Sequence, residues 1–220
     1  MLIIKQSHEI LHMDGLERIE RAGRTCYKSE DKITDESAPQ FAQMLIKRGH
    51  EAMIEHGGAS VKFVTNRGVT HEIVRHRLCA FGQESTRYVN YGGSDIAFIL
   101  PVWFGTRVPL GQPINPDHLR MDPKDRMTAD ERWMLSILES EETYGHLLRA
   151  GWRPEQAREV LPNSLKTEIV VTANYREWRH IFKLRALGTT GKPHPQMQAL
   201  MLPVLEDFRE ALPALFGDLA

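Results

Sequence analysis

The sequence has few cysteines, no long apolar run and almost no net charge. Only Cys26 and Cys79 occur among 220 residues, so no disulfide framework is expected and the reducing cytoplasm fits. No charge-free apolar segment is long enough to span a bilayer, and no apolar run follows a basic start as in a secretion signal. The formal net charge of −1 provides no global basic field for nucleic acid. We therefore expect a cytoplasmic protein that binds neither a membrane nor nucleic acid.

Two common ligand-binding signatures are also missing. The segment that starts at His71-Glu72 begins like H-E-x-x-H but ends in Arg75, and the segment at His50-Glu51 has Ile54 at the required position. Neither places two histidines on one helix face, so a zinc hydrolase is a weak alternative and no metal site is predicted. No glycine-rich dinucleotide fingerprint occurs, so a bound flavin would not lie on a Rossmann fold.

The remaining composition predicts one ordinary globular domain over residues 1–220. Hydrophobic residues make up 41% and charged residues 26%, which suffices for a normal core. The expected strands are residues 2–4, 59–64, 96–100 and 167–172. The expected helices are residues 11–26, 39–48, 68–74, 128–150, 154–161, 174–186 and 195–215, the last of them interrupted near Pro203 and Pro213. Helices and strands alternate without a βαβ rhythm, which indicates an α+β fold. Five prolines within residues 101–126 predict a long loop there.

The segment Arg75–Tyr88 is the most informative part of the chain. It reads R-H-R-L-C-A-F-G-Q-E-S-T-R-Y, with three arginines and no lysine. Arginine holds phosphate and other planar anions through a rigid fork of donors, whereas a solvated basic face normally mixes Lys and Glu at helical spacing. We interpret the segment as the wall of a site for an anionic, nucleotide-like ligand.

The spacing of this segment resembles the signature of the flavin-dependent thymidylate synthases, R-H-R-x-x-S-x-N-x-x-S-x-R-Y. The matching residues are Arg75, His76, Arg77, Ser85, Arg87 and Tyr88. Ala80 and Gly82 replace the Ser and Asn of the signature, which leaves the charged positions intact. Two further segments are similar to family motifs: residues 49–56 resemble G-H-E-x-x-x-E-H, and residues 174–186 resemble N-x-R followed by L-R-A.

The resemblance implies two sets of site residues. The set implied for dUMP is Glu72, Arg75, Gln83, Glu84, Ser85, Thr86, Arg87, Arg158 and Arg185. The set implied for FAD is His50, Ala52, Glu55, Arg75, His76, Arg77, Leu78, Gln83, Asn174, Arg176 and His180. Without the resemblance, Arg158 is an ordinary exposed arginine, Asn174 a helix cap and His180 a surface residue.

Arg185 stands out on the residues alone. It continues the stripe of Trp178, Ile181 and Phe182, where an apolar residue is expected at i+7. A buried charge needs a partner, so either an internal salt bridge or an anionic ligand would fit. In the family an arginine here contacts uracil and assists ionisation at N3, so the resemblance implies that Arg185 is catalytic.

The resemblance also implies the whole reaction. The chain would methylate dUMP to dTMP with methylenetetrahydrofolate as carbon donor, while NADPH reduces bound FAD. The implied fold has a central, mostly antiparallel sheet with flanking helices, and the implied assembly is a homotetramer with sites at subunit interfaces. A non-enzymatic RNA-binding module is the other alternative, against which the net charge and an inward Arg185 argue. Neither cysteine is needed as a nucleophile, so Cys79 is interpreted as a packing residue.

Overall fold

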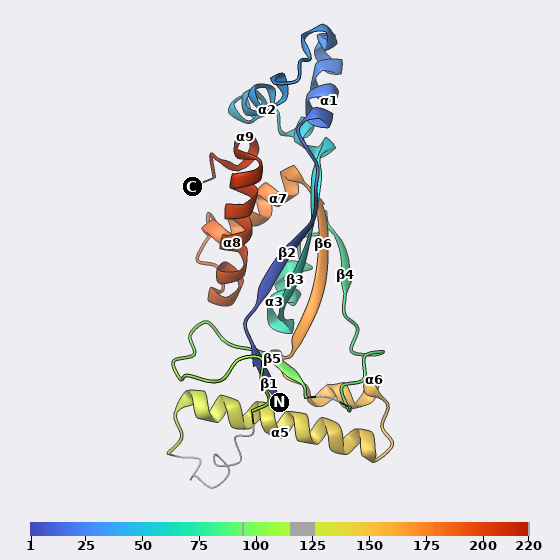
Figure 1. Cartoon of the computed structure of the whole chain (residues 1–220), viewed down its shortest axis with the longest axis vertical. Coiled ribbons are helices and arrows are strands. Elements are labelled where there is room, and N and C mark those ends of the chain that lie inside the picture. Colours follow the sequence, from blue (N-terminus) through green and yellow to red (C-terminus); the bar gives the residue numbers. More distant parts are fainter. Residues whose placement is uncertain (94, 115–125, 220) are drawn as a thin grey trace. The chain divides into compact units, whose positions relative to one another are not determined.

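The computed structural model describes residues 1–93, 95–114 and 126–219. Figure 1 shows the helices and strands in the order of the chain. The strands are β1 (Leu2–Ile4), β2 (Ser7–Met13), β3 (Gly58–Asn66), β4 (Ala80–Gln83), β5 (Ala97–Ile99) and β6 (Lys166–Asn174). The α-helices are α1 (Glu17–Tyr27), α2 (Ser37–Lys47), α3 (Arg67–Ile73), α5 (Ala129–Arg149), α6 (Pro154–Ala157), α7 (Tyr175–Phe182), α8 (Pro195–Ala211) and α9 (Pro213–Phe216). Shorter helical turns are η1 (Glu30–Lys32), η2 (Glu51–His56), η3 (Arg158–Val160) and the π-helical η4 (Lys183–Leu187).

The main sheet has four strands in the order β2-β3-β6-β4. Its central pair is antiparallel, because Tyr175 at the end of β6 donates to Gly57 before β3, while Arg67 after β3 donates to Leu165 before β6. Burial alternates along β3 and β6, as expected for strands with one covered face. A separate parallel pair is formed by β1 and β5. The predicted α+β class, with an antiparallel sheet and flanking helices, is confirmed.

The chain divides into two compact units, and β3 and β6 run through both. Unit 1 comprises residues 1–7, 64–71 and 83–169, and unit 2 comprises residues 8–63, 72–82 and 170–220. The expectation of one domain over the whole chain stays a prediction.

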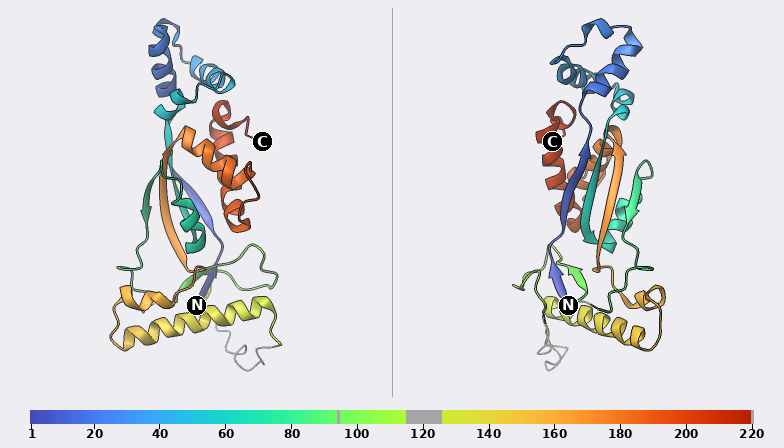
Figure 2. Two further views of the ribbon diagram at one scale, coloured as in Figure 1. Left: turned by 180° about the vertical axis from the view of Figure 1, so that it is seen from behind. Right: turned by 45° about the vertical axis from the view of Figure 1, so that its right-hand side comes forward.

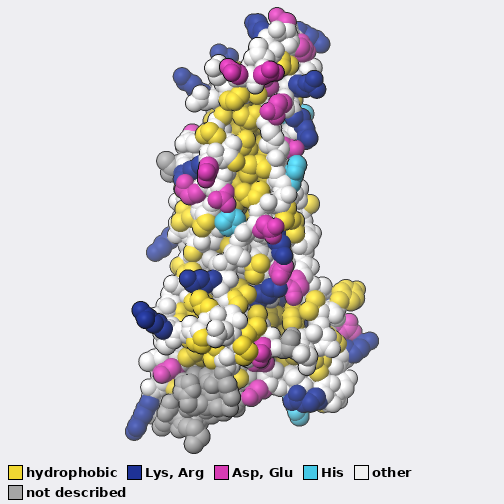
Figure 3. Space-filling model, in the orientation of Figure 1, with side chains coloured by type: hydrophobic (Ala, Val, Ile, Leu, Met, Phe, Trp, Pro, Cys, Tyr) yellow, Lys and Arg dark blue, Asp and Glu magenta, His cyan; other side chains and the backbone are white. Residues whose placement is uncertain are grey.

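Charged side chains of both signs are interspersed on the face seen in Figure 3. Among the described residues, no helix is both long and apolar enough to cross a bilayer.

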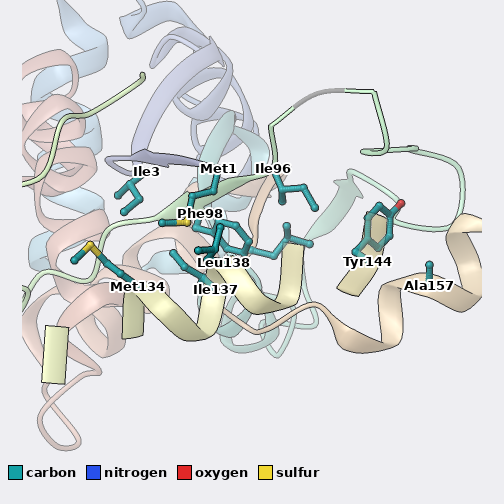
Figure 4. Close-up of a cluster of buried hydrophobic side chains, with 10 residues drawn as sticks. Met1, Ile3, Ile96, Phe98, Met134, Ile137, Leu138, Tyr144 and Ala157 are labelled. Carbon is teal, nitrogen blue, oxygen red and sulfur yellow. The ribbon is translucent and has the colours of Figure 1, made fainter. Parts of the chain in front are cut away.

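The core of unit 1 lies between the β1–β5 pair and α5. Figure 4 shows Ile3 and Phe98 from the two strands beside Met134, Ile137 and Leu138 from the helix. These three helix residues recur at i, i+3 and i+4, so α5 buries one stripe and leaves the opposite face to solvent. The predicted helix over residues 128–150 is therefore confirmed.

The core of unit 2 is an aromatic cluster. The Trp178 ring is stacked on Phe182 with centroids 5.6 Å apart, and Phe208 of α8 is 5.3 Å from Trp178 and 5.1 Å from Phe182. Phe216 of α9 adds a T-shaped contact to Phe208 at 5.1 Å. Such pairs add roughly 0.5–1.5 kcal/mol each beyond burial of their area. The cluster fixes α7 against α8, which lie side by side in both views of Figure 2.

Both long strands end in an asparagine that caps the next helix. The Oδ1 of Asn66 accepts the backbone N–H of Val69 at 2.8 Å, and the Oδ1 of Asn174 accepts that of Glu177 at 2.9 Å. Each side chain satisfies a donor that the first helical turn leaves free. The predicted cap at Asn174 is confirmed, and the same device at Asn66 starts the helix that precedes the arginine-rich segment.

The helix interruption expected near Pro203 is wrong, because α8 continues through Pro203 to Ala211, whereas the one near Pro213 is confirmed by the break at Leu212. Two further expectations need correction. The helix expected over residues 11–26 is wrong at its start, because β2 occupies residues up to Met13 and α1 begins only at Glu17. The side chains of β2 alternate in burial beside β3, so sheet pairing overrides the helical spacing of Leu11 and Leu16. The helix expected over 174–186 ends as α-helix at Phe182 and continues as a π-helical turn. The described part of the expected loop after Pro101 contains no helix, and residues 115–125 of that loop lie outside the described residues.

Thr128 supplies a test of how α5 begins. Its Oγ1 accepts from the Glu131 backbone at 3.3 Å while the Glu131 carboxylate accepts the Thr128 N–H at 2.8 Å, which is a capping box. We expect Thr128→Ala to lower the free energy of unfolding by about 1 kcal/mol and the Tm by about 2–4 °C. Thr143→Ala is the matched control, because Thr143 is exposed within the same helix and only back-bonds to Glu139. Equal losses in both variants, measured by thermal unfolding, would show that the cap contributes nothing.

Candidate active site

The arginine-rich segment begins in a series of turns after α3. The backbone N–H groups of Arg75, His76 and Cys79 donate to carbonyls three residues earlier, and β4 then starts at Ala80. These turns expose the side chains of Arg75 and Arg77 and bury His76, which is 6% exposed. The three basic residues at the start of the segment therefore differ in exposure: the guanidinium groups of Arg75 and Arg77 are exposed, and the imidazole of His76 is buried.

Arg185 lies on η4 and joins this segment to Glu72, in the part of α3 that belongs to unit 2. Its Nε donates to His76 Nε2 at 3.1 Å, and its Nη1 forms an ion pair with Glu72 Oε2 at 2.9 Å. The Arg185 side chain is 24% exposed, so its charge is only partly solvated. The structure thus brings together three predicted residues, Glu72, His76 and Arg185. Arg185 thus has the internal salt bridge that was one of the two expectations from the sequence.

Burial lowers the pKa of His76 to about 4, assisted by the positive charge of Arg185 and by His180. The imidazole is therefore neutral at pH 7, which agrees with its Nε2 accepting a hydrogen bond from Arg185. Glu177 Oε1 lies 3.4 Å from the other ring nitrogen, Nδ1. Burial raises the pKa of this carboxyl above its ordinary value. Because burial disfavours the charged imidazolium, the contact between His76 and Glu177 joins a neutral ring to a carboxyl group and is not an ion pair.

A cleft of about 630 Å³ in unit 2 gathers five residues predicted to hold the flavin. They are Glu55, Leu78, Asn174, Arg176 and His180. Arg176 spans the cleft edge, with Nη1 2.6 Å from Glu55 Oε1 and Nε 3.7 Å from Glu51. The volume lies within the ordinary range for ligand pockets.

Other predicted flavin residues do not line this cleft. His50 and Ala52 lie before and within η2, where Tyr27 Oη is 3.3 Å from His50 Nδ1. Four other residues that line the cleft were not predicted from the sequence: Glu51, Glu177, Arg179 and Lys183. Helical spacing could have found Lys183, because it follows Arg176 and His180 at i+7 and i+3. Arg179 is instead structural, since its guanidinium forms two bonds of 2.6 and 2.7 Å with Asp218.

In unit 1 the predicted residues Gln83 and Glu84 are held by internal partners. The Gln83 amide donates to Thr70 at 2.9 Å and to Thr167 at 3.3 Å. The Glu84 carboxylate accepts from Tyr91 Oη at 2.8 Å and from Lys166 Nζ at 3.2 Å. These bonds fix the start of the turn that carries Ser85, Thr86 and Arg87.

The same turn borders a smaller cleft of about 370 Å³ in unit 1. Arg158 donates to Thr86 Oγ1 at 3.2 Å there, and His71 and Arg67 also line the cleft. The Nε of Arg67 is buried and has no hydrogen-bond partner among the described groups. The Arg87 side chain is 56% exposed, and its Nε lies 4.0 Å from Glu155 Oε2, which is a long distance for an ion pair. Most of its donors therefore face solvent. The arrangement can hold an anion through several guanidinium donors.

The cysteines differ in environment. Burial, aided by the charge of Glu177, raises the pKa of the Cys79 thiol to about 12, so it carries almost no thiolate at pH 7. Cys26 is exposed and lies 3.9 Å from the Met53 sulfur. Among the described residues no three metal-ligating side chains converge.

Comparison with known proteins adds independent findings. The family model described as "Thymidylate synthase complementing protein" matches residues 10–214. A flavin-dependent thymidylate synthase of Corynebacterium aurimucosum is 35% identical over 205 residues, covering 91% of this chain and 78% of the relative. One from Mycobacterium tuberculosis is 32% identical over 208 residues, with the same coverage.

A solved structure has the same fold. It is that of the UMP/dUMP methylase PolB from Streptomyces cacaoi bound with 5-Br dUMP, with a TM-score of 0.78 and 19% sequence identity. It covers 99% of this chain and 96% of that one. With the family model matched over almost the whole sequence, this chain belongs to the family of flavin-dependent thymidylate synthases.

Proposed function

We propose that this protein is a flavin-dependent thymidylate synthase that methylates dUMP to dTMP, with methylenetetrahydrofolate as carbon donor and NADPH as reductant of bound FAD. The observation that carries the proposal is the cleft of unit 2, where five residues expected to hold the flavin lie together. Family membership over residues 10–214 supports the same reaction. The family's homotetramer, with sites at subunit interfaces, is part of the proposal.

The residues of the cleft fit a flavin dinucleotide. Arg176, His180 and Lys183 supply cationic or neutral donors suited to a diphosphate, while Asn174 and Leu78 offer an amide and an apolar wall. When bound, reduced FAD supplies the hydride that completes the new methyl group. Glu55 and Glu51 hold Arg176 across the cleft edge, so the protein orients one guanidinium before any ligand arrives.

Each unit by itself presents arginines that suit an anionic part of a nucleotide. In unit 1, Arg158 lines the cleft beside Thr86 and Arg87 is exposed on the same turn, and both guanidinium groups are suited to a phosphate. In unit 2, Arg185 is suited to uracil, where negative charge develops as the ring attacks the methylene carbon. Such charge is best stabilised by a fixed donor with restricted access to water. Glu72 balances Arg185 when no substrate is bound, which leaves the guanidinium already oriented.

The direct test of this function is dTMP formation from dUMP with FAD, NADPH and methylenetetrahydrofolate. We expect turnover to require all four compounds, and the purified protein to carry FAD or to bind it when added. Arg176→Ala should weaken FAD binding by about tenfold or more, because a charge-assisted bond is lost. Arg18→Ala is the control, since Arg18 is an exposed, ion-paired arginine of unit 2 outside the cleft. Repeated failure of folded protein to bind FAD would refute the assignment.

The cysteines provide a second test. We expect Cys26→Ser and Cys79→Ser each to keep synthase activity, because no thiolate nucleophile is needed when the hydride comes from reduced flavin. The raised pKa of Cys79 agrees with this, since a thiol that stays protonated is a poor nucleophile. Turnover should be measured per flavin bound. Complete loss in a Cys79→Ser protein that still binds FAD and dUMP would contradict the mechanism.

Arg185→Ala is the third test. We expect it to fold, bind FAD and lose about 3–4 kcal/mol of transition-state stabilisation, a hundredfold to thousandfold drop in kcat. Arg185→Lys should recover only part of the loss, because a point charge lacks the planar fork. The rival interpretation is that the Arg185–Glu72 pair is purely structural. A lowered Tm with near-normal turnover per flavin site would support that rival.

A further inference from the structure

Arg185 could act on uracil only if its guanidinium plane is held in one orientation. Glu72 holds one end of the group at 2.9 Å through Nη1, and His76 holds the other through Nε at 3.1 Å. Glu72 is a flexible side chain that is 32% exposed, whereas the His76 ring is 5% exposed and planar. The imidazole is therefore the more rigid of the two supports.

The hydrogen bond from Arg185 also determines where the imidazole proton lies. Since His76 Nε2 accepts, the single proton of the neutral ring must be on Nδ1. Nδ1 faces Glu177 Oε1 at 3.4 Å, and that carboxyl is 7% exposed. The low pKa of His76 agrees with a neutral ring in this position. If the proton moved to Nε2, two N–H groups would face each other and Arg185 would lose this support.

We propose that Glu177 is a positioning residue for the proposed synthase reaction: its carboxyl keeps the His76 proton on Nδ1, so that Nε2 accepts Arg185 and the guanidinium stays aimed. The proposal rests on the proposed function for its catalytic consequence. Its structural part concerns only the ligand-free protein.

Three charged or titratable side chains of the described residues lie against His76: Glu177, His180 and Arg185. Glu177 and His180 come from α7, with the His180 ring centroid 5.9 Å from that of His76. Arg185 comes from η4, and Glu72 of α3 reaches the ring only through Arg185. Asn174 caps the backbone of Glu177, which fixes the helical turn that carries the carboxyl. The cap, the acid, the ring and the guanidinium thus form one continuous series.

The experiment is nitrogen NMR of the His76 ring in the full-length protein at neutral pH, without flavin or nucleotide. We expect the wild type to show the tautomer protonated on Nδ1. Glu177→Gln should keep it, because an amide oxygen in the same place can accept a hydrogen bond from Nδ1. Glu177→Leu should lose the tautomer preference and shift the Arg185 Nε–H signal. Glu206→Leu, an exposed glutamate of α8 in the same unit, is the control and should change neither signal.

Kinetics of the same variants test the catalytic consequence. Glu177→Leu should lower kcat by about tenfold to a hundredfold, as for a misplaced catalytic group, while KM for dUMP changes less. Glu177→Gln should restore most of the loss. A wild-type ring protonated on Nε2 or on both nitrogens would overturn the proposal, and this holds even if Glu177→Leu does not fold.

Two further results would also overturn it. The first is an unchanged tautomer and Arg185 signal in folded Glu177→Leu. The second is weaker FAD binding in that variant with the tautomer retained, which would make Glu177 a flavin contact. Because the NMR measurement needs no turnover, a wild-type protein without synthase activity would refute the proposed function and leave the tautomer result standing on its own.

Discussion

The antiparallel pairing of β3 with β6 is the constraint on which the candidate site depends. Each strand delivers the chain to a helix that begins at a strand-terminal asparagine, Asn66 for α3 and Asn174 for α7. The helix after β3 leads into the arginine-rich segment, and the helix after β6 leads to Arg185. A slip of one residue in this pairing would move the buried side chains of the slipped strand to the other face of the sheet and displace the start of the helix that follows it. Register therefore controls the chemistry as well as the core.

Two buried or half-buried guanidinium groups of unit 2 each have a carboxylate partner. Arg179 is matched by Asp218, and Arg185 by Glu72. His76 avoids the problem by staying neutral, and burial raises the pKa of Glu177. Burying unpaired charge would cost several kcal/mol at each of these positions. The aromatic cluster around Trp178 packs on the apolar face of α7, while the charged residues of the same helix have partners of their own.

Local signals predicted much of this. The apolar stripe of α5, the cap at Asn174 and the strand that became β6 follow from periodicity and side-chain chemistry. The start of β2 could not be predicted, because only its neighbour β3 makes residues before Met13 extended. The π-helical turn η4 could not be predicted from the sequence either, and it determines the direction of the Arg185 side chain. The contacts of Glu84 with Lys166 and of Glu177 with His76 join residues 82 and 101 positions apart. Periodicity and local motifs carry no information about contacts between residues so far apart in the sequence.

The environment of Cys79 has a consequence for the chemistry of oxidants. Peroxides and electrophiles react with the thiolate, and this thiol is almost wholly protonated at pH 7 because of burial and the nearby Glu177. A protein that handles a reduced flavin is exposed to peroxide whenever that flavin meets oxygen. A sulfur in the middle of the arginine-rich segment would be a point of damage if it were reactive. Burial, aided by the charge of Glu177, keeps the thiol protonated, so the segment can contain a cysteine without becoming sensitive to oxidants.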